Sequence, residues 1–199
     1  MPKGTGRPPA TSRTALERVA LELFSTQGFA ETTVDEIADA AGIARRTLFR
    51  YYPSKNDLVW GDFDARLADL ESWLAAAPAD QPLVETLRDA VVRFNALAPD
   101  EVASHRQRMS LILYVPALQA HSTLRYARWR AVVAGFAARR LRRSDDELWP
   151  QLVGHVALGA AVAAYERWLV DESEDLPALL SAAFDAVALR LPDQDGSTP

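Results

Sequence analysis

A short stretch of the sequence, residues 45–55, carries four cations and no acidic residue. Arginine can donate two hydrogen bonds to the major-groove edge of guanine, and both arginine and lysine bind phosphate. If the stretch is helical, Arg45, Arg46 and Arg50 share one arc, and Leu48 points away from it. We therefore expect the arc to face DNA and Leu48 to lie in the core. The alternative is that the arc is only a solvated surface.

The sequence around this stretch predicts a helix-turn-helix. A first helix is expected over residues 13–27. Thr33 and Glu36 form a capping-box signature that opens a second helix, and Gly42 ends it after two turns. A third helix, residues 44–51, follows after a turn so short that the two helices must cross steeply. In such a motif the second of the two crossed helices enters the major groove of DNA.

The rest of the chain is predicted to be helical as well. Apolar residues recur with a period near 3.6 almost everywhere, and no segment of strand length alternates with period two. The expected fold class is all-α, with a three-helix DNA-binding domain followed by a C-terminal helical domain. Further helices are expected from Ser54 to about Ala77, near 82–98, 100–114 and 116–143, from the Ser144 and Glu147 capping box to Val170, and from Pro177 to 191.

Composition excludes several classes of protein. The chain has no cysteine, so it has no disulfide and no thiolate metal site, and a reducing cytoplasm is the expected location. Its start lacks the apolar core of a signal peptide, and no apolar run approaches a membrane span. The sequence has no Gly-x-Ser-x-Gly motif and no phosphate-binding glycine loop, and His105, His121 and His155 lack metal-ligand spacing. We therefore expect that the protein is neither an enzyme nor a membrane protein, and that it has no metal site and no cofactor.

The segment TTVDEIADAAGIARRTLFRYYPSKNDL, residues 32–58, resembles the signature of the TetR family of transcriptional regulators. The resemblance is specific over residues 12–60 and only architectural beyond them. Ala44 departs from it by lacking the hydroxyl common at this helix start, and Phe49 departs by replacing a common tyrosine. From the residue chemistry and the resemblance together, DNA contacts are expected at Arg7, Thr33, Arg45, Arg46, Thr47, Phe49, Arg50, Tyr51 and Lys55.

The residues and the resemblance together predict four regions. They are a flexible basic arm at 1–12, a DNA-binding domain at 13–55, a ligand-binding and dimerisation domain at 56–191, and a disordered tail at 192–199. Arg7 in the arm would reach the minor groove, unless the arm adds only nonspecific attraction. Dimerisation through the last two helices is implied, and their excess of apolar surface agrees with it. The residues expected at that interface are Val156, Ala160, Ala163, Leu180, Ala183, Phe184 and Val187.

A pocket for a small, largely hydrophobic ligand is implied in the middle helices. The GRPP arm, residues 6–9, and the arginine-rich third helix are similar to regulators of mycofactocin gene clusters, which implies a long-chain acyl-coenzyme A as effector. Arginines beside an apolar tunnel would suit such a ligand, although aromatics at helical spacing are more often only core. Ligand contacts are expected at Phe94, Arg106, Met109, Leu113, Arg125, Trp129, Phe136 and Trp168.

The expected function is that of a dimeric repressor that leaves a palindromic operator when its ligand binds. Movement of the fourth helix is expected to transmit the signal, because Lys55 lies at one end of it and ligand-domain residues lie at the other. The alternatives are an activator, a ligand-independent protein that organises DNA, and an enzyme.

Overall fold

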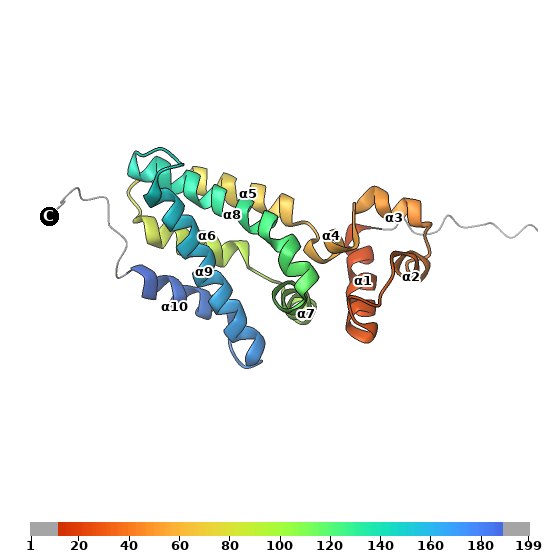
Figure 1. Ribbon diagram of the computed structural model, residues 1–199. Coiled ribbons are helices and arrows are strands. Elements are labelled where there is room, and N and C mark those ends of the chain that lie inside the picture. The colour runs from red at the N-terminus through yellow and green to blue at the C-terminus, as the bar shows by residue number, and fades with distance from the viewer. Residues whose placement is uncertain (1–11, 189–199) are drawn as a thin grey trace, which may run out of the picture. The chain divides into compact units, whose positions relative to one another are not determined.

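A computed structural model describes residues 12–188 of the protein, and all regular elements in that range are helices (Figure 1). The prediction of an all-α fold is therefore confirmed. The chain forms two compact units that divide between Gly61 and Asp62. The predictions for the basic arm, for Arg7 and for the tail lie outside the described residues.

The N-terminal unit holds the predicted helix-turn-helix. Leu16, Ile37 and Leu48, one from each of the first three helices, are almost completely buried together. Ser12 caps the first helix by accepting a hydrogen bond from the amide of Ala15, 3.1 Å away. The helices are α1 (Arg13–Gln27), α2 (Val34–Ala40), α3 (Arg45–Tyr51) and α4 (Lys55–Trp60).

The prediction of one long helix from Ser54 to Ala77 is wrong. The helix is interrupted at Gly61, whose φ of 55° and ψ of −134° belong to a region that only glycine adopts readily. The amide of Gly61 still bonds to the carbonyl of Asp57, so α4 closes its last turn before the chain turns away. The apolar stripe expected along one helix is consequently shared by two helices, which belong to different units.

The C-terminal unit is a bundle in which α8 packs beside α9, and α10 packs against α9 and α6 (Figure 1). Helices α8 and α9 approach each other closely at Gly154, where a Cβ would lie 2.9 Å from the carbonyl oxygen of Arg130. The elements are α5 (Phe63–Ala76), α6 (Leu83–Phe94), a 3-10 turn (Pro99–Glu101), α7 (Val102–Tyr114), α8 (Pro116–Leu141), α9 (Leu148–Val170) and α10 (Leu176–Ala188).

Helix α9 starts later than the capping box at Ser144 predicted. Glu147 does accept a hydrogen bond from the Ser144 amide, at 2.8 Å, but the helix begins only at Leu148. Pro150 explains the delay, because proline lacks the amide hydrogen that a helix interior requires and is tolerated in the first turn. With the observed start, Pro150 lies in that first turn.

Within the described part of the chain, α9 is also the one helix long and apolar enough to cross a membrane, judged by length and composition. Part of its apolar surface is buried against the neighbouring helices α8 and α10. The core helix of a soluble protein has the same properties, so a membrane span does not follow.

Candidate functional site

Three arginines of α3 lie at the surface of the N-terminal unit. Arg45, Arg46 and Arg50 are exposed, whereas Leu48 is only 1% exposed. The expectation that Leu48 belongs to the core is therefore confirmed, and the arginine arc is open to a ligand. Among the other predicted DNA contacts on α3, Phe49 is exposed, and Thr47 and Tyr51 are half-buried.

The arginines of α3 differ in their contacts with other side chains. Arg45 forms an ion pair with Asp35 of α2, with 2.9 Å between Nη1 and Oδ2, and its guanidinium lies 5.4 Å from the centre of the Phe49 ring. The guanidinium of Arg50 lies over the ring of Tyr51. Within residues 12–188, no hydrogen bond or ion pair engages the side chain of Arg46. The role of Asp35 was not predicted from the sequence, since an acidic residue in a first helical turn is explained by the helix dipole alone.

The capping box that starts α2 is present. The Thr33 amide donates to Glu36 Oε2 at 2.7 Å, and the Glu36 amide donates to Thr33 Oγ1 at 3.2 Å. The hydrogen bonds that the Thr33 amide and hydroxyl donate to the Glu36 carboxylate hold the pKa of Glu36 below its ordinary value. The Thr33 hydroxyl also donates to Glu36, so this predicted DNA contact already has a role in the fold. Ala44 makes no cap at the start of α3, as expected.

Two further contacts join parts of the N-terminal unit that are distant in sequence. The Tyr52 hydroxyl, which follows α3, donates to the Glu17 carboxylate of α1 at 2.5 Å, and both residues are buried. The ammonium of Lys55 donates to backbone carbonyls of the turn between α1 and α2. Lys55 was predicted to bind DNA phosphate; in the protein without DNA its ammonium contacts these carbonyls, and the phosphate contact stays a prediction. The pair of Glu17 and Tyr52 was not predicted, although a carboxylate beside the apolar face of α1 indicates a buried partner.

A chain of buried polar side chains links α6, α7 and α9 in the C-terminal unit. The Tyr165 hydroxyl donates to Asn95 Oδ1 at 2.6 Å, and His105 Nε2 lies 2.8 Å from the same hydroxyl. Asn95 Nδ2 donates to the Val91 carbonyl at 2.8 Å, which fixes the orientation of the amide. Because the one hydroxyl proton goes to Asn95, His105 must donate to Tyr165, so its ring carries a proton on Nε2.

The surroundings of these hydrogen-bonded side chains disfavour the charged forms of His105 and Tyr165. Burial, reinforced by the positive charges of Arg66 and Arg108, lowers the pKa of His105 to about 3. Burial raises the pKa of the Tyr165 hydroxyl above its ordinary value. Both side chains are therefore neutral at physiological pH, and the hydrogen bonds that join them are between neutral groups.

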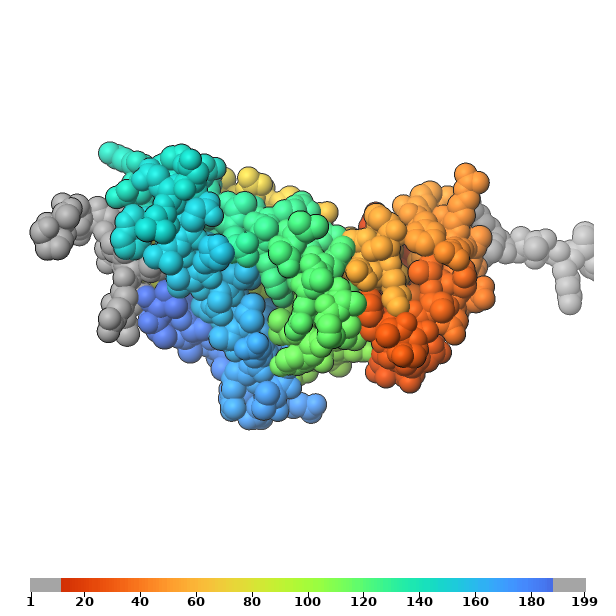
Figure 2. Space-filling model, in the orientation of Figure 1, coloured from red at the N-terminus to blue at the C-terminus, as the bar shows by residue number. Residues whose placement is uncertain are grey.

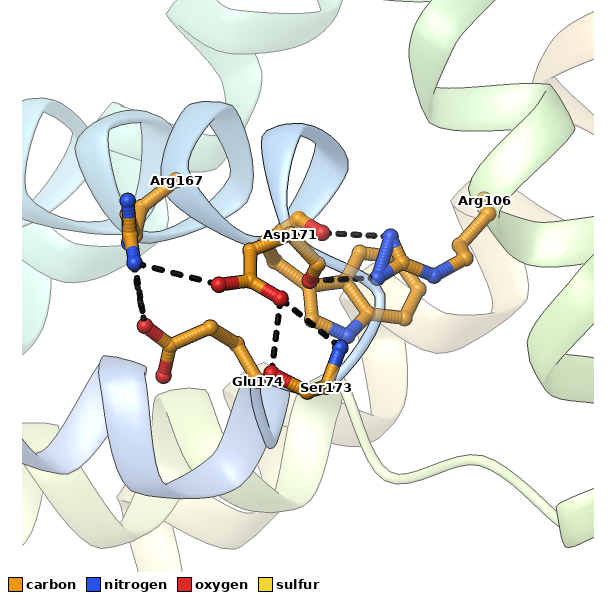
Figure 3. Close-up of polar contacts among 6 residues, drawn as sticks. Arg106, Arg167, Asp171, Ser173 and Glu174 are labelled. Carbon is orange, nitrogen blue, oxygen red and sulfur yellow. Dashed lines mark hydrogen bonds and ion pairs between the residues drawn. The ribbon is translucent and has the colours of Figure 1, made fainter.

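Arg106, from α7, reaches the C-terminal end of α9 (Figure 3). Its guanidinium lies 4.2 Å from the centre of the Trp168 ring and donates to the carbonyls of Trp168 and Asp171, the latter at 2.9 Å. The Asp171 carboxylate in turn accepts hydrogen bonds from Ser173 and pairs with Arg167. Arg106 therefore stabilises the end of α9, where a cation complements the helix dipole.

A second cluster of arginine and aromatic side chains joins α5, α8 and the end of α6. Arg66 donates to the carbonyl of Phe94 and lies over its ring, and that ring packs edge-on against Phe63 at 6.3 Å. Arg125 lies 5.6 Å from the centre of the Phe63 ring and pairs with Asp64 at 2.7 Å. Phe94 and Arg125 are thus in one cluster, and Arg66 connects it to the polar chain through its charge on His105.

The predicted ligand contacts do not form one group. Arg106 and Trp168 are together, Phe94 and Arg125 are together, and Phe136 instead packs under Arg140 near the end of α8. The remaining three predicted contacts are Met109 and Leu113, which are half-buried, and Trp129, which is buried. Arg66 and Asn95 were not predicted. The one weak indication in the sequence was that polar Asn95 follows the apolar face of α6.

Two of the predicted dimer contacts need correction. Leu180 and Phe184 are 0% and 2% exposed within a single chain, because α10 packs this face against α9 and α6. They have no surface left for a partner. The face of α9 that turns away from its own unit is largely apolar, and α9 lies at the visible surface in Figure 2. Its exposed or half-exposed apolar residues are Leu148, Trp149, Leu152, Val156, Gly159, Ala160, Ala163 and Val170. Exposed His155 and Glu166 lie on the same face. On α10, Ala183 and Val187 are half-buried.

Comparison with known proteins identifies both units. Residues 18–59 match the family model described as bacterial regulatory proteins of the tetR family, and residues 81–192 match the MftR C-terminal domain. A Mycobacterium tuberculosis protein provisionally named as the mycofactocin biosynthesis transcriptional regulator MftR is 47% identical, over 94% of each chain. The transcriptional regulator TcmR of Streptomyces glaucescens is 30% identical, over 93% of this chain and 86% of its own.

A solved structure extends the comparison to the fold. The Thermus thermophilus repressor FadR, crystallised in complex with lauroyl-CoA, has a TM-score of 0.58 and 23% identity, and the match covers 94% of this chain and 99% of FadR. Ligand binding and dimerisation are typical of the regulators in this family. The chain belongs to the TetR family of bacterial transcriptional regulators and is a regulator rather than an enzyme.

Proposed function

We propose that this regulator is a repressor that reads a palindromic operator with its two α3 helices, as a homodimer in the cytoplasm. The observation that carries the proposal is the open arc of Arg45, Arg46 and Arg50 on α3, whose opposite side is anchored by buried Leu48. Arg45 and Arg46 are assigned to base edges. Thr47, Phe49, Arg50 and Tyr51 lie next to them and contact the DNA backbone or a base methyl group.

The dimer is proposed to form through the exposed apolar face of α9 and the adjoining surface of α10. A surface of this kind on a soluble protein marks an interaction site, and a two-fold dimer presents two recognition helices to two half-sites. The revised contact set keeps Val156, Ala160, Ala163, Ala183 and Val187 from the sequence prediction. Introducing an arginine at Ala163 is expected to give monomers in analytical ultracentrifugation. The same change at Ala68, exposed on α5, is expected to leave the dimer intact.

The effector is proposed to be small and largely hydrophobic, with a long-chain acyl-coenzyme A as the first candidate. Two comparisons support this choice: the relative named for mycofactocin biosynthesis, and the repressor solved with lauroyl-CoA. The cluster of Arg66, Phe94 and Arg125 combines cationic and aromatic groups, as an acyl chain with a phosphorylated head requires. Met109, Leu113, Trp129 and Trp168 would supply apolar surface.

Repression and release can be tested in one experiment. The purified chain is incubated with DNA from upstream of its own gene at stated salt, and bound sequences are mapped by footprinting. A discrete palindromic footprint supports the repressor, and binding without sequence preference contradicts it. Lauroyl-CoA, laurate and coenzyme A are then added separately. Release by lauroyl-CoA alone supports the proposed effector, release by laurate alone indicates a fatty acid, and no release by any of them contradicts the acyl-CoA proposal.

A further inference from the structure

Two arginines of α8 meet at a single carboxylate oxygen of α5. Nη1 of Arg125 lies 2.7 Å from Oδ1 of Asp64, and Nη1 of Arg128 lies 2.6 Å from the same atom. A carboxylate carries one negative charge, whereas a phosphate monoester carries up to two and offers three acceptor oxygens. Two guanidinium groups at this spacing therefore suit a phosphate group better than the carboxylate that they hold.

The three side chains differ in how firmly they are held. The side chain of Arg125 is 16% exposed and lies over the ring of buried Phe63, with 5.6 Å to the ring centre. The side chains of Arg128 and Asp64 are 54% and 59% exposed. Exposed ion pairs contribute little to stability, because water solvates the separated charges well. Asp64 can consequently leave the arginines for solvent, while the aromatic contact keeps Arg125 in place.

The arginine pair lies beside the aromatic cluster described above. Phe63, which Arg125 covers, packs edge-on against Phe94, and Arg66 covers the ring of Phe94. Asp64 belongs to the first turn of α5, a helix whose N-terminus has no side-chain cap, and a helix N-terminus favours bound anions. Arg106, in contrast, is committed to two carbonyls at the end of α9.

We propose that Arg125 and Arg128 bind a phosphate group of the effector, and that Asp64 occupies this anion site in the ligand-free chain. The phosphate displaces the Asp64 carboxylate and accepts hydrogen bonds from both guanidinium groups through separate oxygens. The acyl chain then starts from the aromatic cluster of Phe63 and Phe94. The inference rests on the proposed acyl-coenzyme A effector and specifies which side chains recognise its head.

The alternative is that Asp64 only ties α5 to α8. Calorimetric titration with two thioesters separates the roles: lauroyl-CoA, and lauroyl-pantetheine, which has the same acyl chain and thioester but no phosphate. We expect Arg128→Gln to weaken lauroyl-CoA about tenfold, because hydrogen bonds between charged groups are lost, and to leave lauroyl-pantetheine unchanged. Arg139→Gln removes an exposed cation from the same helix and should change neither affinity.

Asp64→Asn provides the sharper test, because it removes the internal competitor and keeps the size of the side chain. We expect it to tighten lauroyl-CoA about three- to tenfold and to leave lauroyl-pantetheine unchanged. The gain should shrink at high salt, where exposed charges are screened. Asp69→Asn removes one exposed charge from the same helix and serves as the control. An equal gain in both variants, or no gain in Asp64→Asn, would overturn the proposal.

Inorganic pyrophosphate tests the anion site without an acyl chain. At matched ionic strength, it is expected to raise the melting temperature of the wild type and of Arg139→Gln more than that of Arg128→Gln. If the wild type bound neither thioester, the acyl-coenzyme A proposal would fail, and pyrophosphate would still decide whether the arginine pair binds phosphate. Equal stabilisation of the wild type and Arg128→Gln would show that it does not.

If Arg128→Gln does not fold, Arg128→Lys replaces it, because lysine keeps the charge but lacks the planar fork that donates two parallel hydrogen bonds. We expect its affinity for lauroyl-CoA to fall by a smaller factor than that of Arg128→Gln, again with lauroyl-pantetheine unchanged. A loss of equal size for both thioesters would mean that Arg128 supports the fold of the pocket, and would overturn the proposal.

Discussion

The two units of this protein place their arginines in opposite situations. On α3, Arg46 and Arg50 are exposed and form no ion pair or hydrogen bond within the described residues. In the C-terminal unit, Arg66 and Arg106 stack on aromatic rings and donate to backbone carbonyls. An exposed guanidinium is available to an external anion, whereas an engaged one first has to leave its carbonyl partners.

This contrast separates binding from stability. Changing an exposed arginine of α3 is expected to remove contacts with DNA and to leave the fold intact. Changing a buried polar side chain of the C-terminal unit leaves its partners without hydrogen bonds, which costs more than the bond itself. The comparison therefore predicts large effects on DNA affinity in one unit and large effects on the free energy of unfolding in the other.

The largest effect is expected for Arg46→Ala. A bidentate contact between arginine and guanine contributes about 1–3 kcal/mol, and a dimer makes it twice, so operator affinity should fall about 100-fold or more. The melting temperature should stay within about 1 °C of the wild type, because surface changes rarely alter stability. Gel shifts and calorimetry measure both quantities. Arg18→Ala, which removes an exposed cation from α1, is the control; an equal loss in both variants would mean that α3 is not reading bases.

Tyr165→Phe should show the reverse behaviour. The change removes the hydroxyl between His105 and Asn95 and leaves a buried donor and a buried acceptor unsatisfied. We expect the free energy of unfolding to fall by about 2–3 kcal/mol. Tyr114→Phe removes the same atom from a tyrosine that is 53% exposed, and should be nearly neutral. Denaturant unfolding that gave equal stabilities for the two variants would show that the buried polar chain does not stabilise the unit.

The pH dependence of stability should also differ between the wild type and a His105 variant. The pKa of His105 is lowered from 6.5 to about 3, so the unfolded chain binds a proton that the folded chain rejects. Its contribution is complete above pH 6.5 and is lost as the pH falls toward 3, with a slope of up to about 1.4 kcal/mol per pH unit. Unfolding between pH 6.5 and 5 should reveal this slope in the wild type and a shallower one in His105→Gln. Equal slopes would mean that His105 is protonated in the folded state.

The N-terminal unit could be predicted from the sequence in more detail than the C-terminal unit, and the reason is physical. The bounds of α1 and the capping box at Thr33 follow from interactions within a few residues, and the burial of Leu48 follows from the helical period. Gly61 was missed because a glycine inside an apolar helical pattern is tolerated or not according to the packing around it. Its positive φ became visible only in the structure.

The C-terminal unit depends on packing between distant segments. Leu180 and Phe184 have the composition of an interface, but burial against α6 and α9 assigns them to the core. Arg106 resembled a ligand contact because sequence does not show that Trp168 and Asp171 lie beside it. The sequence pattern therefore identified which faces of α9 and α10 are apolar, and it could not decide which of them are already covered.

The smallest predicted effect tests whether the arginines of α3 are truly independent of the fold. Arg45 pairs with Asp35, and both side chains are more than half exposed, so Asp35→Asn should change the free energy of unfolding by no more than about 0.5 kcal/mol. The released guanidinium should raise the affinity for nonspecific DNA a few-fold and steepen the salt dependence of that affinity.

Asp39→Asn is the control. It removes the same charge from α2, and among the described residues no hydrogen bond or ion pair involves the side chain of Asp39. If nonspecific binding, measured by fluorescence anisotropy, rises equally in both variants, only net charge matters and Arg45 is as free as Arg46. A larger rise in Asp35→Asn would mean that the N-terminal unit too restrains one of its arginines, and that Asp35 favours operator over other DNA.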